Sequence, residues 1–322
     1  MKKVTLKDIA AKAGVSIALV SNYLNHHPSA RMSEQTRKKI DHALRELDYH
    51  CSDIARSLRT GRSRIIGYFS ENLRNEVTQN EMLEFFAAAA KEDYRVFVGF
   101  SSCRGETLES IRSLQARGCD ALVISGFFDQ QYCELLMEIP VPVVILNTNC
   151  SAAVPGTVLR YDYKSAIRDG IGYLRAHGHD GIYYQTRSCE PWDQRYQEFS
   201  DTFPEDHVWL LQKKNAQPED WRAFLKKHPD CSALFHLNDF LAMDSIRICS
   251  QLGLSVPGDI SIIGFDNIRV AEHTLPSLST ISRPLSEAAE HAVASLLARL
   301  NGKKSELPEV PSCRFIPRES IR

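Results

Sequence analysis

Hydrophobic positions follow two different patterns along the chain, and the pattern changes near residue 64. Before that point, apolar residues recur every three or four positions, as on one face of a short helix. From Ile65 onward they come in short continuous runs, separated by longer amphipathic stretches. The change predicts a small helical head followed by a much larger α/β body.

Capping and turn residues divide the head into three predicted helices. Thr5 and Asp8 have the spacing of a capping box, and Gly14 is placed to end the helix that they begin. Ser16 and Ser33 are placed to cap the second and third helices. The expected apolar faces contain Ile9, Ala10, Ala13, Val20, Leu24, Ile40, Leu44 and Leu47.

The body alternates predicted strands with predicted helices. Its mostly apolar runs are 65–70, 94–100, 121–125, 141–147, 181–185, 232–237 and 260–266. Amphipathic stretches between them include 81–92, 107–117, 164–177 and 239–252. Continuous apolar strands suit parallel sheets covered on both faces. These runs exceed one mononucleotide-type half, so we expect two doubly wound lobes with a ligand cleft beyond the carboxyl ends of the strands.

Charge is unevenly distributed between head and body. The 322 residues carry a formal net charge of −1, but residues 1–64 hold 13 Lys and Arg against 6 Asp and Glu. A basic head on an acidic body favours a head that contacts polyanions. The alternative is a merely solvated N-terminus.

The nine cysteines are scattered and never spaced as CxxC, which argues against a disulfide framework or a zinc site and for a reducing compartment. No apolar stretch follows the first lysines, and no run approaches the roughly 18 apolar residues of a membrane span. We therefore expect a cytoplasmic protein without membrane contact.

Several motifs occur in an order and spacing typical of one family. They are TLKDIAxxAGVSxxxVSxxLN (5–25), LxYxxxxxARSL (47–58), AHGHDGI (176–182), LNDFLA (237–242), VPGDISIIGFDN (256–267), LPSLSTI (275–281) and RES (318–320). Over essentially its whole length the chain thus resembles the lactose-repressor/galactose-repressor (LacI/GalR) transcription regulators. The resemblance implies an all-α helix-turn-helix head and a core similar to periplasmic binding proteins, made of two doubly wound α/β lobes.

The resemblance also implies domain limits. The helix-turn-helix DNA-binding domain is expected over 1–49, a hinge helix or linker over 50–63, and an effector-binding and dimerisation core over 64–322. Within the core, one lobe is expected at about 64–160 with a return over 290–320, and the other over 161–289.

The family places its second helix in the major groove of DNA. Residues here that match its phosphate contacts are Thr5, Ser16, Ser21 and Asn25, which would set register without reading sequence. Its base-reading positions fall at Ile17, Ala18 and Asn22. Asn22 suits adenine, and the two apolar residues suit thymine methyl groups, so we expect an A·T-leaning half-site. The alternative for Ile17 is a place in the core of the head.

In the family, the linker forms a hinge helix that orders on DNA. Leu58 matches its minor-groove wedge, Ala55 lies alongside, and Arg56 would supply backbone charge. The family often has proline and asparagine where Cys51 and Ser52 stand here. A flexible tether is the alternative for this segment.

The effector-binding positions of the family match Glu71, Asn147, Arg195, Trp221, Asn238, Asp266 and Arg283. Their chemistry suits a polar small molecule such as a sugar. Arg195 and Arg283 would suit an anionic effector such as a phosphorylated sugar, whereas Glu71 and Asp266 oppose one. At two further positions, Glu198 and Asp244 replace glycines that the family usually has. The alternative for Asp266 is a simple strand-end turn.

The expected function is therefore a transcriptional regulator, most simply a repressor, that binds a pseudo-palindromic operator in double-stranded DNA and responds to a small-molecule effector, expected to be a carbohydrate. Only two residues follow Ser320, which leaves no room for a tetramerising heptad tail, so a homodimer is expected. A periplasmic-type solute-binding protein is the alternative, but it would need a signal peptide. We find no signature of an enzyme, a cofactor loop or a metal site, and we expect none of these.

Overall fold

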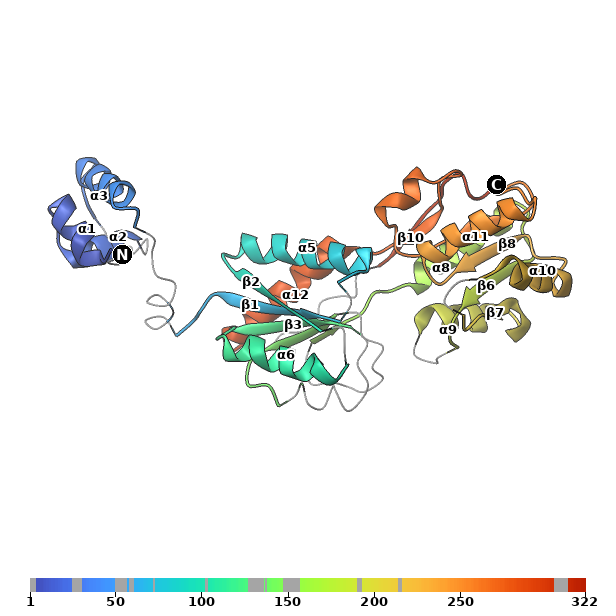
Figure 1. Cartoon of the computed structure of the whole chain (residues 1–322), viewed down its shortest axis with the longest axis horizontal. Helices are drawn as coiled ribbons and strands as arrows, with labels where there is room; N and C mark the ends of the chain where they lie inside the picture. The colour runs from blue at the N-terminus through green and yellow to red at the C-terminus, as the bar shows by residue number, and fades with distance from the viewer. Residues whose placement is uncertain are drawn as a thin grey trace. The chain divides into compact units, whose positions relative to one another are not determined.

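The computed structural model describes residues 4–24, 31–49, 57, 61–71, 73–101, 104–126, 136, 138–146, 157–189, 193–213, 216–303 and 312–322. The chain forms two compact units, Met1–Ser63 and Arg64–Arg322, which are described separately (Figure 1). No helix in this described part of the chain is long and apolar enough to cross a membrane.

The first unit contains three helices, α1 (Leu6–Ala13), α2 (Ile17–Leu24) and α3 (Glu34–Glu46), which confirms the three predicted from the sequence. The Asp8 carboxylate accepts hydrogen bonds from the backbone N–H (2.8 Å) and the hydroxyl (2.6 Å) of Thr5. Gly14 ends α1 with a φ of 68°, a left-handed conformation that glycine adopts without strain.

The head encloses a small core of its own. The side chains buried there are Ile9, Ala10, Ala13, Val20, Ile40 and Ala43. Two polar contacts tie the helices together from outside: Tyr23 on α2 donates to Asp41 on α3 (2.6 Å), and Lys12 on α1 donates to Glu46 (2.6 Å). Helix α2 therefore packs on the core through its inner side, and its outer side stays exposed.

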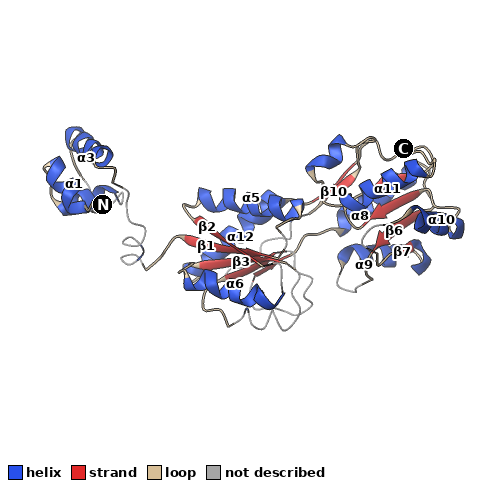
Figure 2. Ribbon diagram, viewed as in Figure 1, coloured by secondary structure: helices blue, strands red, loops and turns tan. Residues whose placement is uncertain are grey.

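The second unit begins with a five-stranded sheet in the order β2-β1-β3-β4-β5 (Figure 2). All of its neighbouring strands are parallel. The strands are β1 (Ile65–Ser70), β2 (Arg95–Phe100), β3 (Ala121–Ser125), β4 (Val143–Leu146) and β5 (Thr157–Leu159). This sheet is the centre of the first lobe.

Helices cover both faces of the first sheet because successive strand residues point to opposite faces. Tyr68 packs with α5 (Glu76–Lys91) and α12 (Leu285–Leu300) on one face. Phe69 packs with α6 (Arg104–Ala116) on the other. The doubly wound architecture expected from the apolar runs is confirmed for this lobe.

The second lobe repeats the plan with a four-stranded parallel sheet in the order β7-β6-β8-β9. Its strands are β6 (Ile182–Thr186), β7 (Val208–Leu210), β8 (Ala233–His236) and β9 (Ser261–Ile263). Two helices, α8 (Lys164–Ala176) and α9 (Gln194–Thr202), supply side chains to the core on one face. Two others, α10 (Pro218–Lys227) and α11 (Asp239–Gln251), do so on the opposite face.

Short elements complete the second lobe. Strands β10 (Thr280–Ser282) and β11 (Arg314–Ile316) pair antiparallel, and two 3₁₀ turns, η1 (Glu205–His207) and η2 (Arg269–His273), lie in connections. The seven apolar runs are all strands, whereas β5, β7, β10 and β11 were not predicted. These four have three residues each, too few for a hydrophobic period to show.

The return of the chain to the first lobe differs from the expected 290–320. Helix α12 packs in the first lobe from Leu285 onward, with Leu296 in the core beside Phe85. The segment 312–322 belongs to the second lobe instead, because β11 pairs with β10 and the carbonyl of Ser320 accepts from the backbone N–H of Ile262 (2.9 Å). The chain therefore crosses between the lobes three times.

Candidate functional site

The outer side of α2 presents short side chains and no charge. Ile17 is 46% exposed, Ala18 and Ser16 are exposed, and Asn22 is half-buried, whereas Val20 on the inner side is fully buried. Ile17 therefore lies outside the core of the head, which excludes the structural alternative for this residue.

Caps at the helix starts use two of the predicted phosphate contacts. The Ser16 hydroxyl oxygen accepts from the backbone N–H of Leu19 (3.2 Å), and Thr5 bonds Asp8 at the start of α1. Ser21 is half-buried on α2. Four other predicted DNA contacts, Asn25, Ala55, Arg56 and Leu58, lie outside the described residues.

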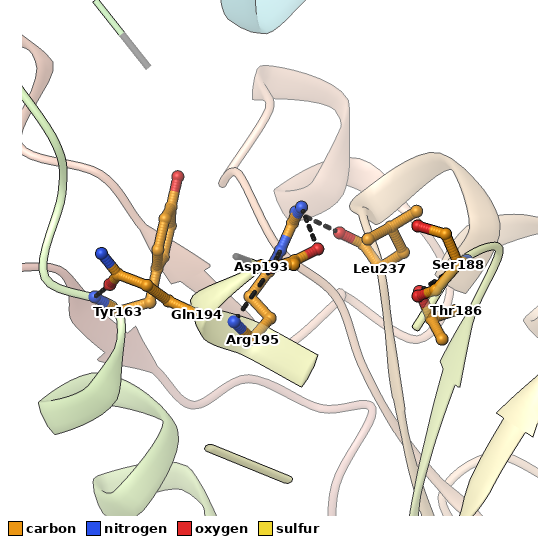
Figure 3. A network of polar contacts seen from close by, with 7 residues as sticks. All are labelled: Tyr163, Thr186, Ser188, Asp193, Gln194, Arg195 and Leu237. Carbon is orange, nitrogen blue, oxygen red and sulfur yellow. Dashed lines mark hydrogen bonds and ion pairs between the residues drawn. The ribbon is translucent and has the colours of Figure 1, made fainter. Parts of the chain in front are cut away.

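Arg195 is held in place from several sides in the second lobe (Figure 3). Its guanidinium forks onto both carboxylate oxygens of Asp193 at 3.0 Å and donates to the carbonyl of Leu237 at 3.0 Å. It also lies over the rings of Tyr163 and Phe265, 5.8 and 5.7 Å from their centroids. One donor on each guanidinium nitrogen is thus directed to a protein acceptor, and the guanidinium also lies against two aromatic rings.

Arg283 follows β10, where the chain crosses toward α12. Its guanidinium contacts Asp266 (3.2 Å) and lies 5.3 Å from the ring centroid of Tyr161. Burial opposes its charge, but its neighbours raise its pKa above the usual value; they are Tyr163, Asp266, Tyr161 and Glu81. Among the described residues, the buried Nε atom of Arg283 has no hydrogen-bond partner.

Asp266 has an unusual backbone. Its φ is 111° and that of Asn267 is 53°, conformations that side chains other than glycine rarely adopt. The backbone N–H of Asn267 donates to the Thr280 hydroxyl (3.2 Å), and Arg318 donates to the Asn267 side-chain oxygen (2.7 Å). The turn is thereby fixed so that the Asp266 carboxylate meets Arg283.

Glu81 brings a buried negative charge from the first lobe. It lies on α5, 3% exposed, and accepts hydroxyl hydrogen bonds from Ser125 (2.7 Å), Tyr161 (2.8 Å) and Tyr68 (3.4 Å). Its charge acts on Arg283 across the boundary between the lobes. Glu81, Asp193, Arg195, Asp266 and Arg283 are called the interlobe cluster from here on.

A pocket of about 380 Å³ lies beside this cluster. Its lining includes Asp266 and Arg283 from the cluster, Glu84 from α5 and Glu287 from α12. Amide and hydroxyl side chains complete the polar lining: Asn80, Asn267, Ser282 and Ser286. The pocket therefore combines acidic groups with groups that bond hydroxyls.

Trp221 does not belong to this group, contrary to the sequence prediction. It lies on α10, fully buried, with its ring 5.3 Å from that of Trp209 and 6.4 Å from that of Phe224. The spacing of α10 turns this side chain into the second lobe's core, so it offers no face to a ligand. The other five described effector positions are half-buried or, for Arg283, 9% exposed.

Two of these effector positions have local partners. Asn238 caps α11 by accepting from the backbone N–H of Leu241 (3.0 Å), and Glu71 accepts from the Thr107 hydroxyl (3.3 Å). Asn147 lies outside the described residues. Asp239, next to Asn238, is fully buried, accepts from Thr280 (2.6 Å) and from the backbone N–H of Ile268 (2.8 Å), and burial raises its pKa to about 7.

The two acidic residues that replace family glycines are paired locally. Glu198 is buried and bonds Arg168, and Asp244 lies 3.4 Å from Arg247. Neither lines the pocket described above. Groups of His, Cys, Asp and Glu suited to hold a metal ion are absent from the described residues, and the five cysteines described form no disulfide.

Comparison with known proteins shows what each part of the chain is similar to. Residues 5–52 match the model of bacterial regulatory proteins of the lacI family, and residues 171–321 match that of a periplasmic binding protein-like domain. A probable HTH-type transcriptional repressor, ExuR of Bacillus subtilis, is 25% identical and aligns over 99% of this chain and 98% of its own. The head is thus similar to the lacI family of regulators, and the body to periplasmic binding proteins.

Solved structures of this family share the whole fold. The lac repressor dimer bound to operator and the anti-inducer ONPF matches with a TM-score of 0.82 at 22% identity, over 99% of both chains. A complex of the transcriptional regulator CelR with cellobiose matches with a TM-score of 0.67 at 20% identity, over 99% of this chain and 100% of the other. The helix-turn-helix head and the periplasmic-binding-protein-like core expected from the sequence are thereby confirmed.

Three residues of the site were missed in the sequence analysis. Asp193 could have been found as the cap of α9, since its side chain accepts from the backbone N–H of Arg195 (3.0 Å). Glu81 is a carboxylate in the apolar stripe that contains Val77 and Phe85, which is an unusual place for a charge. No pattern marked Tyr161.

Proposed function

We propose that this protein is a LacI-family transcriptional regulator that binds a pseudo-palindromic operator as a homodimer and responds to a sugar or sugar derivative bound between its lobes. The interlobe cluster carries the proposal. It draws Glu81 from the first lobe, Arg195 and Asp266 from the second, and Arg283 from the crossing between them. A ligand that contacts these groups stabilises one lobe arrangement over another, by as much as its affinities for the two differ.

The exposed side of α2 supports base reading by the head. Ile17 and Ala18 suit thymine methyl groups, and Asn22 suits the N6 and N7 atoms of adenine. We therefore propose a half-site that leans toward A·T at these contacts. The similar protein reported above is named as a transcriptional repressor, which supports regulation rather than catalysis. We place this activity in the cytoplasm.

An exposed apolar edge supports the homodimer. Strand β2 is at the edge of its sheet, and three of its side chains are between 39% and 45% exposed: Phe97, Val98 and Phe100. An uncovered apolar edge strand is a surface that a second chain can cover. The matched lac repressor is a dimer bound to operator.

The first test is to recover fragmented genomic DNA on the purified protein, at low and at moderate salt, and to sequence it. A shared palindrome with A·T-rich half-site contacts that survives moderate salt supports the proposal. Recovery of unrelated fragments that is lost as salt rises overturns it, because counterion release alone gives that result. A half-site with a dominant guanine under α2 contradicts the base-reading assignment.

A further inference from the structure

The two arginines of the interlobe cluster do not form an anion-binding pair. The guanidinium of Arg195 donates to both carboxylate oxygens of Asp193 and to the carbonyl of Leu237. Arg283 is paired with Asp266. An anionic group that took the place of either carboxylate would leave a buried acidic group without its partner, which is strongly unfavourable. An anionic group that entered beside the carboxylates would be repelled by their like charge.

Glu81 adds a carboxylate that forms no ion pair with an arginine among the described residues. Its three hydrogen bonds all come from neutral hydroxyls, so they solvate the carboxylate without cancelling its charge. The neighbouring pocket adds Glu84 and Glu287. The described residues of the cluster and of this pocket's lining thus include five carboxylates and two guanidinium groups.

The remaining polar groups suit hydroxyls. The pocket lining offers the amide of Asn80 and the hydroxyls of Ser282 and Ser286, while the Asn267 side-chain oxygen already accepts from Arg318. The buried Nε of Arg283 has no acceptor among the described residues, and a hydroxyl or ring oxygen can supply one. The lining carries the three carboxylates of Glu84, Asp266 and Glu287 against the one guanidinium of Arg283, so its field favours cations over anions.

We propose that this site admits uncharged or cationic ligands rich in hydroxyls, such as sugars and amino sugars, and rejects anionic ones, with Glu81 as the residue that sets this selectivity. The inference rests on the proposed effector site between the lobes. In the sequence, the two arginines taken alone suit a phosphorylated sugar. The structure favours the opposite charge preference, because both arginines are already paired with carboxylates.

The first experiment follows thermal unfolding of the full chain with inorganic phosphate as the probe, against sodium chloride at the same ionic strength. A ligand at about 100 times its Kd raises the midpoint of a domain of this size by roughly 5–10 °C. We expect phosphate and chloride to give the same midpoint. A rise that is specific to phosphate and is lost in Arg283→Gln overturns the proposal.

The second experiment uses matched triples, such as glucose, glucosamine and glucose 6-phosphate, with the same scaffolds of galactose and mannose. Within any triple that raises the unfolding midpoint, the neutral or the amino sugar should raise it most. If the phosphorylated sugar gives the largest rise, the inference is overturned. In Glu81→Gln the preference of the amino over the phosphorylated member should fall about tenfold, as for loss of one pK unit of charge interaction. Glu92→Gln, on the exposed end of α5, is the matched control and should keep it.

Operator binding, measured on the same preparations by DNA recovery, separates this inference from the proposed function. A protein that binds its palindrome but is stabilised by anionic ligands has the proposed function and lacks the proposed selectivity. A protein without palindrome binding fails the proposed function, whatever the phosphate experiment shows.

Discussion

The two candidate contact surfaces of this protein are built in opposite ways. On α2, the residues predicted to read DNA are uncharged, exposed or half-buried, and supported from behind by a small core. In the interlobe cluster, the residues predicted to meet the effector are charged, mostly buried, and bonded to one another. A surface of the first kind can change its target without changing its stability, whereas a site of the second kind is part of what holds the fold together.

The largest effect should come from removing one half of a buried pair. Asp193→Ala leaves the guanidinium of Arg195 without its carboxylate, and we expect the core to lose about 3–5 kcal/mol in its free energy of unfolding. Urea unfolding measures this loss. The control is Glu219→Ala, which breaks an exposed pair with Arg222 and should cost far less. Equal losses for the two variants would show that the cluster is no more structural than the surface.

The next largest effect should be on how the stability of the core depends on pH. Burial raises the pKa of Asp239 from 3.8 to about 7, so the folded core holds this proton more tightly than the unfolded chain. Stability from this group is therefore complete below about pH 4 and is lost as the pH rises through 7, by roughly 4 kcal/mol at most. Asp239→Asn should flatten that slope in urea unfolding between pH 5 and 8. An unchanged slope would contradict a buried proton at Asp239.

On the head, the expected effect is on specificity. Asn22→Ala removes the only side chain among the three base-reading positions that can bond a base bidentately, and should lose about 1–3 kcal/mol of discrimination at one adenine. Competition between the recovered operator and a version changed at that base measures it. The melting temperature of the head should stay the same, since Asn22 is not part of its core. A loss that is equal for all sequences would mean that Asn22 only positions the helix.

The smallest effect compares two apolar neighbours on α2. Ile17→Ala should change stability by less than about 0.5 kcal/mol because the side chain is 46% exposed, and should weaken binding only where a thymine methyl is present. Val20→Ala, at a fully buried position, should cost roughly 2 kcal/mol of stability. A reversal of these two results would place Ile17 in the core after all.

The sequence was a good guide where a physical pattern repeats. Caps such as Thr5, Ser16 and Ser33 and the period of the apolar residues located all three head helices, and long apolar runs located the central strands. Three-residue strands such as β7 escaped because they are shorter than any period that could reveal them. Their place is set by tertiary pairing, as when β11 joins β10 across 34 residues from Thr280 to Arg314.

The site was harder to predict because a residue type does not show where its side chain points. Trp221 has the chemistry of a sugar-stacking ring, but the register of α10 turns it into the core. Glu81 has the chemistry of a surface residue, but α5 turns it toward three hydroxyls at the edge of the first sheet. The sequence located Arg195 and Arg283 correctly as site residues. It did not show that each is paired with a carboxylate, which reduces the attraction of the site for anions.

The three crossings of the chain have a consequence for its synthesis. The first lobe is translated before the second, yet Ala292, Val293 and Leu296 of its core lie on α12, which leaves the ribosome only after nearly all of the second lobe. Lys91 must wait 199 residues for its partner Glu290. The nascent first lobe therefore leaves the part of this face that α12 will cover exposed throughout the synthesis of the second lobe, so the core that is begun first is finished last.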